Sequence, residues 1–124
     1  MCGITGFIGR GEQRDLMEMT RSLYHRGPDG EGTYIDDRLP VFLGSRRLSI
    51  RDKAKGAQPM SSEDGQMVVV FNGEIYNAAE LRSQLEQRGH RFRSDHSDTE
   101  VLLHGFREWG KAVSYTHLTL PTKA

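Results

Sequence analysis

The chain has 124 residues, of which 35% are hydrophobic, and its 14 glycines bring the composition into the range of one globular domain or part of one. Its 17 basic residues balance 17 acidic residues, and the formal net charge of zero excludes a long-range field favouring nucleic acid or an anionic membrane, so we expect neither as a partner. The longest apolar run, 67–71, is too short to span a membrane, and the N-terminus lacks a signal-peptide pattern, so we predict a cytoplasmic protein.

The first part of the chain predicts a strand, a helix and a hairpin. Glycines mixed with β-branched and aromatic residues predict a strand at 3–10, and apolar residues at helical spacing predict a helix over 12–24. The next segment, 25–30, holds two glycines and a proline and therefore predicts a loop. Two further strand candidates, 33–35 and 39–43, are joined by a polar turn and predict a hairpin.

The middle of the chain predicts two strands separated by a polar loop. Apolar and polar residues alternate over 45–51, which predicts a strand at the edge of a sheet. Turn-forming residues dominate 52–65 and predict a surface loop. The strongest strand pattern in the chain is 66–71, where three consecutive valines stand between a methionine and a phenylalanine.

Two helices are predicted after this strand, and each begins with a capping-box pattern. Asn77 precedes Glu80 by three residues, and Ser97 precedes Glu100 by the same spacing. Apolar side chains recur at helical spacing after both patterns, and Gly89 closes the first of the two helices.

The final segment, 112–124, differs from the rest of the chain. It carries no helical or strand period that continues the preceding helix. We therefore predict that the native domain covers 2–111 and that 112–124 is a non-native tail.

The single cysteine, Cys2, is the first candidate for chemistry. One cysteine can form neither an internal disulfide nor a multi-cysteine zinc site. If Met1 is removed, the thiol and a free α-amine lie on the same residue, and the amine can accept the thiol proton near neutral pH. The alternative is a small buried hydrophobic residue, but position 2 at the start of a predicted strand favours the nucleophile.

Four further residues could complete a site for an amide substrate. Attack on a carboxamide creates an oxyanion, and Asn72 and Gly73 would supply a side-chain amide and an unobstructed backbone N–H directly after the strongest strand. The alternative is a tight hairpin turn, which the capped helix that follows makes less favourable. Arg47 could clamp a carboxylate, although a solvated surface charge is the ordinary interpretation of an arginine. Asp98 stands beside a predicted helix N-terminus, where capping is the ordinary interpretation, so only the combination makes these two residues candidates.

Metal and nucleotide sites are not predicted. The histidines show no helical pair with an intervening glutamate, so a zinc site is not expected. The glycines at positions 9 and 11 lack the full pattern of a phosphate-binding loop.

Six motifs occur in the order seen in class II glutamine amidotransferases. The motifs are Cys2-Gly3-Ile4, His25-Arg26-Gly27-Pro28-Asp29-Gly30, Arg47-Leu48-Ser49-Ile50, Gln58-Pro59, Asn72-Gly73-Glu74-Ile75-Tyr76-Asn77 and Ser97-Asp98-Thr99-Glu100. Over 2–111 the chain most closely resembles the N-terminal glutaminase domain of glutamine-hydrolysing asparagine synthetases.

The resemblance implies both a fold and a reaction. The fold is an N-terminal nucleophile hydrolase fold, an α+β structure arranged as an αββα sandwich, which this chain would leave incomplete at its C-terminus. The reaction is the hydrolysis of L-glutamine to glutamate and ammonia by the Cys2 thiolate, with Asn72 and Gly73 forming the oxyanion hole.

The resemblance also implies a substrate-binding set and a supporting loop. Arg47 would hold the α-carboxylate of glutamine, Asp98 would bind its ammonium group, and Arg26 would order the surroundings of the nucleophile. The full substrate-binding set implied is Arg47, Leu48, Ser49, Ile50, Arg51, Asn72, Gly73, Glu74 and Asp98.

A longer parent chain follows from the same resemblance. Its C-terminal synthetase domain would use ATP and magnesium to adenylate aspartate, and ammonia would then displace AMP to give asparagine. The present chain would itself need no cofactor. Two alternatives stay open, namely an amidotransferase acting on another acceptor and a non-catalytic truncated fragment, and the oligomeric state is also open, a homodimer included.

Overall fold

Five strands, three α-helices and one short 3-10 helix form the described part of the computed structural model, which comprises residues 2–48, 57–94 and 97–112. The strands are β1 (Gly3–Ile8), β2 (Gly30–Ile35), β3 (Val41–Arg47), β4 (Met60–Ser61) and β5 (Val68–Val69). The helices are α1 (Gln13–Arg21), α2 (Ala78–Gln87), α3 (Asp98–Trp109) and the 3-10 helix η1 (Gly110–Ala112). The predicted tail lies outside the described residues except for its first residue.

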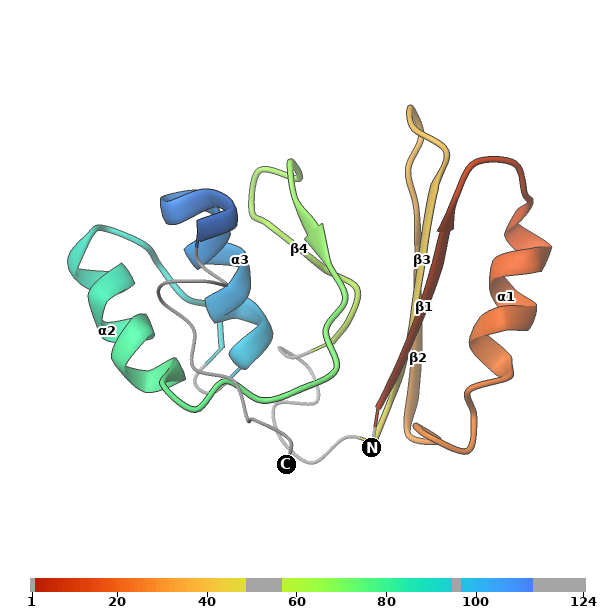
Figure 1. Ribbon diagram of the computed structural model, residues 1–124, viewed down its shortest axis with the longest axis horizontal. Coiled ribbons are helices and arrows are strands. Elements are labelled where there is room, and N and C mark those ends of the chain that lie inside the picture. Colours follow the sequence, from red (N-terminus) through yellow and green to blue (C-terminus); the bar gives the residue numbers. More distant parts are fainter. Residues whose placement is uncertain (1, 49–56, 95–96, 113–124) are drawn as a thin grey trace.

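The elements lie in layers (Figure 1). Helix α1 covers one face of a three-stranded antiparallel sheet, and the antiparallel pair of β4 and β5 lies beyond the other face, with α3 and α2 outermost. Helices in the described ranges are all too short or too polar to cross a lipid bilayer.

The three-stranded sheet has β3 at its centre, between β1 and β2. Its antiparallel register pairs Gly3 with Arg46 and Gly30 with Arg47. The beginnings of β1 and β2 therefore meet the end of β3 at one end of the sheet. Because successive side chains of a strand point to opposite faces, Arg46 and Arg47 lie on different faces.

The strand predicted at 3–10 and the predicted hairpin are confirmed, but the edge strand is wrong. The sequence predicts separate strands at 39–43 and 45–51, whereas one continuous strand, β3, includes 41–43 and 45–47; residues 49–51 lie outside the described residues. Both β1 and β2 pair with β3 at Ser45 and Arg46, so this stretch is central. Polar residues do not mark an edge here, because the central strand buries the polar Ser45 and the charged Arg46.

The predicted helices are confirmed in position and differ slightly in length. Helix α1 is shorter than the predicted 12–24 and packs on the sheet through Leu16 and Thr20, whose side chains are fully buried. Helices α2 and α3 pack together around a core made by Ile75, Leu81, Leu85 and Val101. Leu81 and Leu85 lie one turn apart on α2, and Val101, Leu102 and Trp109 share one side of α3, which is why the sequence locates both helices.

The strand predicted at 66–71 is much shorter than expected. Only Val68–Val69 pairs, and its partner is Met60–Ser61, which lies inside the predicted polar loop. A strand requires a hydrogen-bonding partner along its length, and in the described residues β4 offers just two positions. Strong β propensity alone therefore overestimated this strand.

The two capping-box predictions fare differently. Asn77 makes no side-chain cap hydrogen bond, because its backbone is not in the extended conformation of a capping residue, so the first prediction is wrong. Ser97 does cap α3, since its Oγ accepts from the Glu100 N–H at 3.3 Å. A capping box also requires the Ser97 N–H to donate to the Glu100 side chain, and the described contacts do not include this bond. The buried Glu100 carboxylate instead accepts hydrogen bonds from the backbone N–H groups of Arg93 and Ser94.

Candidate active site

Cys2 lies directly before β1 at the end of the sheet where β3 finishes. It is a free cysteine and is half-buried. The next residue, Gly3, is buried and pairs with Arg46, so the backbone of Cys2 is held in place by the sheet. A Cβ at Gly3 would contact Leu23, which lies just beyond the C-terminal end of α1, so Gly3 faces α1. Because successive side chains of a strand point to opposite faces, the Cys2 thiol lies on the face turned away from α1.

Asn72 contacts the predicted nucleophile directly. Its side-chain Nδ2 donates a hydrogen bond to the backbone carbonyl of Cys2 at 2.9 Å, although the two residues are 70 positions apart in the chain. Asn72, Gly73 and Glu74 are exposed and lie in the loop between β5 and α2. The loop leads into a helix, so the hairpin turn considered for Asn72 and Gly73 does not form.

Asp98 is tied to the same loop. Its Oδ2 accepts a hydrogen bond from the backbone N–H of Ile75 at 2.8 Å, one residue beyond Glu74. The capping hydrogen bond of α3 is supplied by Ser97, so the carboxylate of Asp98 serves the loop rather than its own helix. The structure therefore brings Asp98 to the loop that carries Asn72 and Gly73.

The loop at 25–30 packs against the end of β3. The backbone N–H of Asp29 donates to the carbonyl of Arg47 at 2.9 Å, and Pro28 forms an isolated bridge with Arg47. Gly27 is buried here, and a Cβ at this position would lie only 2.4 Å from the backbone of Arg46 and Arg47. Glycine thus permits the close approach of two backbones, which places the half-buried Arg26 beside the start of β1.

Arg46 is a site-supporting residue that the sequence reasoning missed. Its side chain is 7% exposed, its Nε donates to the carbonyl of Gly27 at 2.9 Å, and its Nη1 pairs with Glu31 Oε2 at 2.6 Å. The guanidinium also lies 5.0 Å from the centre of the Tyr24 ring. The signal that could have found Arg46 is the cross-strand position of Glu31, but that signal requires the register of β2 and β3.

Four other predicted substrate-binding residues directly follow Arg47 in the sequence. Leu48 follows β3 and is exposed. Ser49, Ile50 and Arg51 lie outside the described residues. The structure therefore brings together the end of β3, the loop that carries Asn72 and the start of α3.

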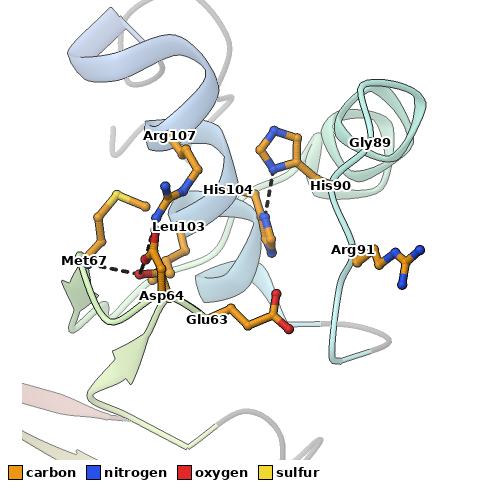
Figure 2. Close-up of a pocket in the computed structure, with 10 residues that line it drawn as sticks. Glu63, Asp64, Met67, Gly89, His90, Arg91, Leu103, His104 and Arg107 are labelled. Atoms are coloured by element: carbon orange, nitrogen blue, oxygen red, sulfur yellow. Dashed lines mark hydrogen bonds and ion pairs between the residues drawn. The ribbon is translucent and has the colours of Figure 1, made fainter.

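A separate pocket of about 330 Å³ lies between the turn joining β4 and β5, helix α3 and the segment that follows α2 (Figure 2). Its lining contains none of the residues predicted for glutamine. Figure 2 shows His90 and His104 turned toward each other, with 2.9 Å between their Nδ1 atoms. Among the described residues, no group of three or more histidine, cysteine or carboxylate side chains is arranged to hold a metal ion.

The two histidines of this pocket are part of a hydrogen-bonded chain. Glu108 contacts His90 Nε2 at 3.0 Å, and Glu100 contacts His104 Nε2 at 3.4 Å. Burial lowers the pKa of His104 below its usual value, although Glu100 opposes the shift. Burial raises the pKa of Glu100, but hydrogen bonds from Ser94 and neighbouring donors outweigh it and hold that pKa below its usual range. This cluster therefore acts as a structural link between α3 and the segment before it.

Comparison with known proteins identifies the family. A family model described as a glutamine amidotransferase domain matches residues 1–118. This chain belongs to the glutamine amidotransferase family. The resemblance inferred from the six ordered motifs is thus confirmed.

The relatives of this amidotransferase chain include several asparagine synthetases. It is 44% identical over 116 residues to asparagine synthetase (glutamine-hydrolyzing) 1 of Bacillus subtilis, covering 88% of this chain and 18% of the relative. It is 41% identical over 123 residues to the asparagine synthetase (glutamine-hydrolyzing) of Sandersonia aurantiaca, covering 95% and 22%. The match to asparagine synthetase (glutamine-hydrolyzing) 1 of Arabidopsis thaliana is 41% over 115 residues, covering 89% and 19%. The amidotransferase chain spans about a fifth of the length of these curated relatives.

Proposed function

We propose that this chain is the glutaminase part of a glutamine-hydrolysing asparagine synthetase, with Cys2 as the nucleophile. The observation that carries the proposal is the hydrogen bond from Asn72 Nδ2 to the carbonyl of Cys2. It joins the first motif of the family pattern to the fifth and sets a side-chain amide donor beside the residue that bears the thiol.

The chemistry begins with the removal of Met1, which frees the α-amine of Cys2. The amine takes the thiol proton, and the thiolate attacks the carboxamide carbon of glutamine. Negative charge develops on the carboxamide oxygen, where Asn72 and the backbone N–H of Gly73 are the donors that stabilise it. An amide nitrogen carries two N–H groups, so Asn72 can hold the Cys2 carbonyl with one and the oxyanion with the other.

The leaving nitrogen takes the proton back from the α-amine and departs as ammonia, which leaves a thioester on Cys2. A water molecule then attacks the thioester carbon, with the α-amine again accepting a proton, and releases glutamate and the free thiol. One residue thus supplies both the nucleophile and the base.

Substrate recognition requires one cation and one anion, because glutamine is a zwitterion at its α-carbon. Arg47 at the end of β3 is assigned to the α-carboxylate. Asp98 is assigned to the ammonium group, and since only its Oδ2 is needed for the Ile75 N–H, its Oδ1 serves the ligand. The remaining substrate contacts are assigned to Leu48, Ser49, Ile50, Arg51 and Glu74, and Arg26 is assigned to ordering the loop beside the nucleophile.

The fold proposed for the complete domain is the αββα sandwich of N-terminal nucleophile hydrolases. The order of layers supports this proposal, since α1, the three-stranded sheet, the second sheet and the pair α2 and α3 follow one another in space (Figure 1). The paired sheets would enclose the face of the first sheet to which Cys2 belongs.

The partner proposed for this chain is the synthetase domain of a longer parent protein. The chain covers about a fifth of the length of relatives whose names combine asparagine synthesis with glutamine hydrolysis, which supports the proposal. ATP and magnesium would be used by that domain to activate aspartate for attack by ammonia. No residue of the present chain is assigned to either of them.

The test combines mass spectrometry with an assay of glutamine-dependent ammonia release. The mature chain should begin at Cys2, and Cys2→Ala should lower the rate by more than about a thousandfold, because the covalent intermediate cannot form. Retention of Met1 together with full activity, or full activity of Cys2→Ala, would refute the proposed mechanism.

A further inference from the structure

Gln58 is a motif residue to which the proposed chemistry gives no role, and both ends of its carboxamide are engaged in hydrogen bonds. Its Oε1 accepts a hydrogen bond from the backbone N–H of Phe71 at 2.7 Å. Its Nε2 donates to Thr99 Oγ1 at 3.0 Å. Phe71 immediately precedes Asn72, and Thr99 immediately follows Asp98, so each contact lies one residue from a predicted glutamine-binding residue.

The main chain of Gln58 is fixed independently, against the three-stranded sheet. A Cβ placed on Gly32 in β2 would lie 1.9 Å from the carbonyl oxygen of Gln58, so the two backbones are in close contact. Gly32 is in register with Ser45 of β3, two residues before Arg47. Gln58 therefore touches the sheet with its backbone and reaches the Asn72 loop and α3 with its side chain.

Gln58 and Asp98 together anchor the Asn72 loop at both ends. The N–H of Phe71 is held by Gln58, and the N–H of Ile75 is held by Asp98. The three residues between these anchored amides are exposed, and their backbone is therefore positioned from its two flanks.

We propose that Gln58 is a positioning residue, which holds the Asn72 loop and the start of α3 in a fixed relation to each other and to the sheet. The inference rests on the proposed function and deepens it. Donors for an oxyanion act only when they are set in advance at the correct distance, and a misplacement of about 1 Å can lower a rate by about a hundredfold. Loss of one of the two flanking anchors should therefore slow the reaction of bound glutamine without exposing or burying the thiol.

The experiment measures the alkylation of Cys2 in the whole chain by two reagents. The first is a glutamine analogue in which a chloromethyl ketone replaces the carboxamide; the thiolate displaces chloride and forms a thioether. The second is iodoacetamide, which forms a thioether with loss of iodide and requires no glutamine site. Rates are followed by mass spectrometry, and the ratio of the two rates separates positioning at the site from general access to the thiol.

Gln58→Met removes both hydrogen bonds while keeping a side chain of similar length, and Thr99→Val removes only the contact to α3. We expect Gln58→Met to slow labelling by the analogue about tenfold or more, Thr99→Val to slow it about threefold, and both to leave the iodoacetamide rate within about twofold. Gln87→Met, on the exposed end of α2, is the matched control and should change neither rate.

The outcomes separate the inference from the proposed function. Equal analogue rates for Gln58→Met and the unsubstituted chain overturn the positioning role, even if free glutamine protects Cys2 in both. If Gln58→Met shows no thermal unfolding transition, Thr99→Val decides, and an unchanged analogue rate in that variant overturns the role. If free glutamine fails to protect Cys2 of the unsubstituted chain from the analogue, the proposed function falls, and the role of Gln58 falls with it.

Discussion

Arg46→Met tests whether the buried cation in β3 holds the loop 25–30 against the sheet. The substitution keeps the length of the side chain but removes the ion pair with Glu31 and the hydrogen bond to the carbonyl of Gly27. We expect it to lower the free energy of unfolding by about 2–4 kcal/mol. Urea unfolding followed by circular dichroism measures this difference.

The magnitude follows from the burial of the two partners. Removing one member of a fully buried ion pair costs about 3–5 kcal/mol, because the other charge is left without compensation. Glu31 keeps 27% of its side chain exposed, so water can solvate its carboxylate once Arg46 is gone, and the cost falls toward the lower end of that range. The carbonyl of the buried Gly27 also loses a donor, which costs about 1–3 kcal/mol and partly overlaps with the first loss.

The matched control is Arg14→Met, which breaks an exposed ion pair. Arg14 Nη2 lies 3.6 Å from Glu12 Oε2, and both side chains are more than 70% exposed, at 76% and 73%. Exposed pairs contribute about 0–1 kcal/mol, so this variant should unfold at nearly the same urea concentration as the unsubstituted chain. A loss for Arg46→Met no larger than that for Arg14→Met would refute the reasoning.

Two further predictions concern the loop at 25–30 and the pocket of Figure 2. Gly27→Ala should lower the free energy of unfolding, measured in urea, by more than about 2 kcal/mol, because its Cβ would lie 2.4 Å from the β3 backbone. The control Gly30→Ala, whose Cβ would have its nearest contact at 4.0 Å, should lower it far less. Equal losses of unfolding free energy in the two variants would contradict the steric argument. The pKa of His104 is lower in the folded than in the unfolded chain, so the unfolded chain binds more protons and the melting temperature should fall as the pH drops from 7 toward 5. His104→Gln should flatten this dependence, and an unchanged slope would exclude His104 as its source.

Helices α2 and α3 were predictable from sequence because an amphipathic period is a local property. The same local reasoning failed at 66–71, where a run of valines predicts a long strand but the described partner, β4, is two residues long. It also failed at Asn77, since a capping residue depends on its backbone conformation as well as on its side chain.

The motifs predicted which residues belong to the candidate site. Only the contacts in the structure show how the supporting residues hold them together. Arg46 and Arg47 are adjacent and identical in type, and the sequence offers no basis for saying which one is buried in an ion pair. The register of β3 decides this, because it places Arg46 opposite Glu31 and turns Arg47 to the other face. Likewise, the positioning role proposed for Gln58 follows only from its hydrogen bonds to Phe71 and Thr99, which are distant from it in the sequence.

By itself, the sequence determined the position of the single cysteine, the places of the three helices and the order of the motifs that identify the family. Each of these is a matter of residue type and near-neighbour spacing. The tertiary structure alone decided that Asn72 reaches Cys2 across 70 positions and that Asp98 holds the loop after it. Strand register and close backbone approach bring these groups together, and both depend on contacts between distant segments that no local pattern encodes.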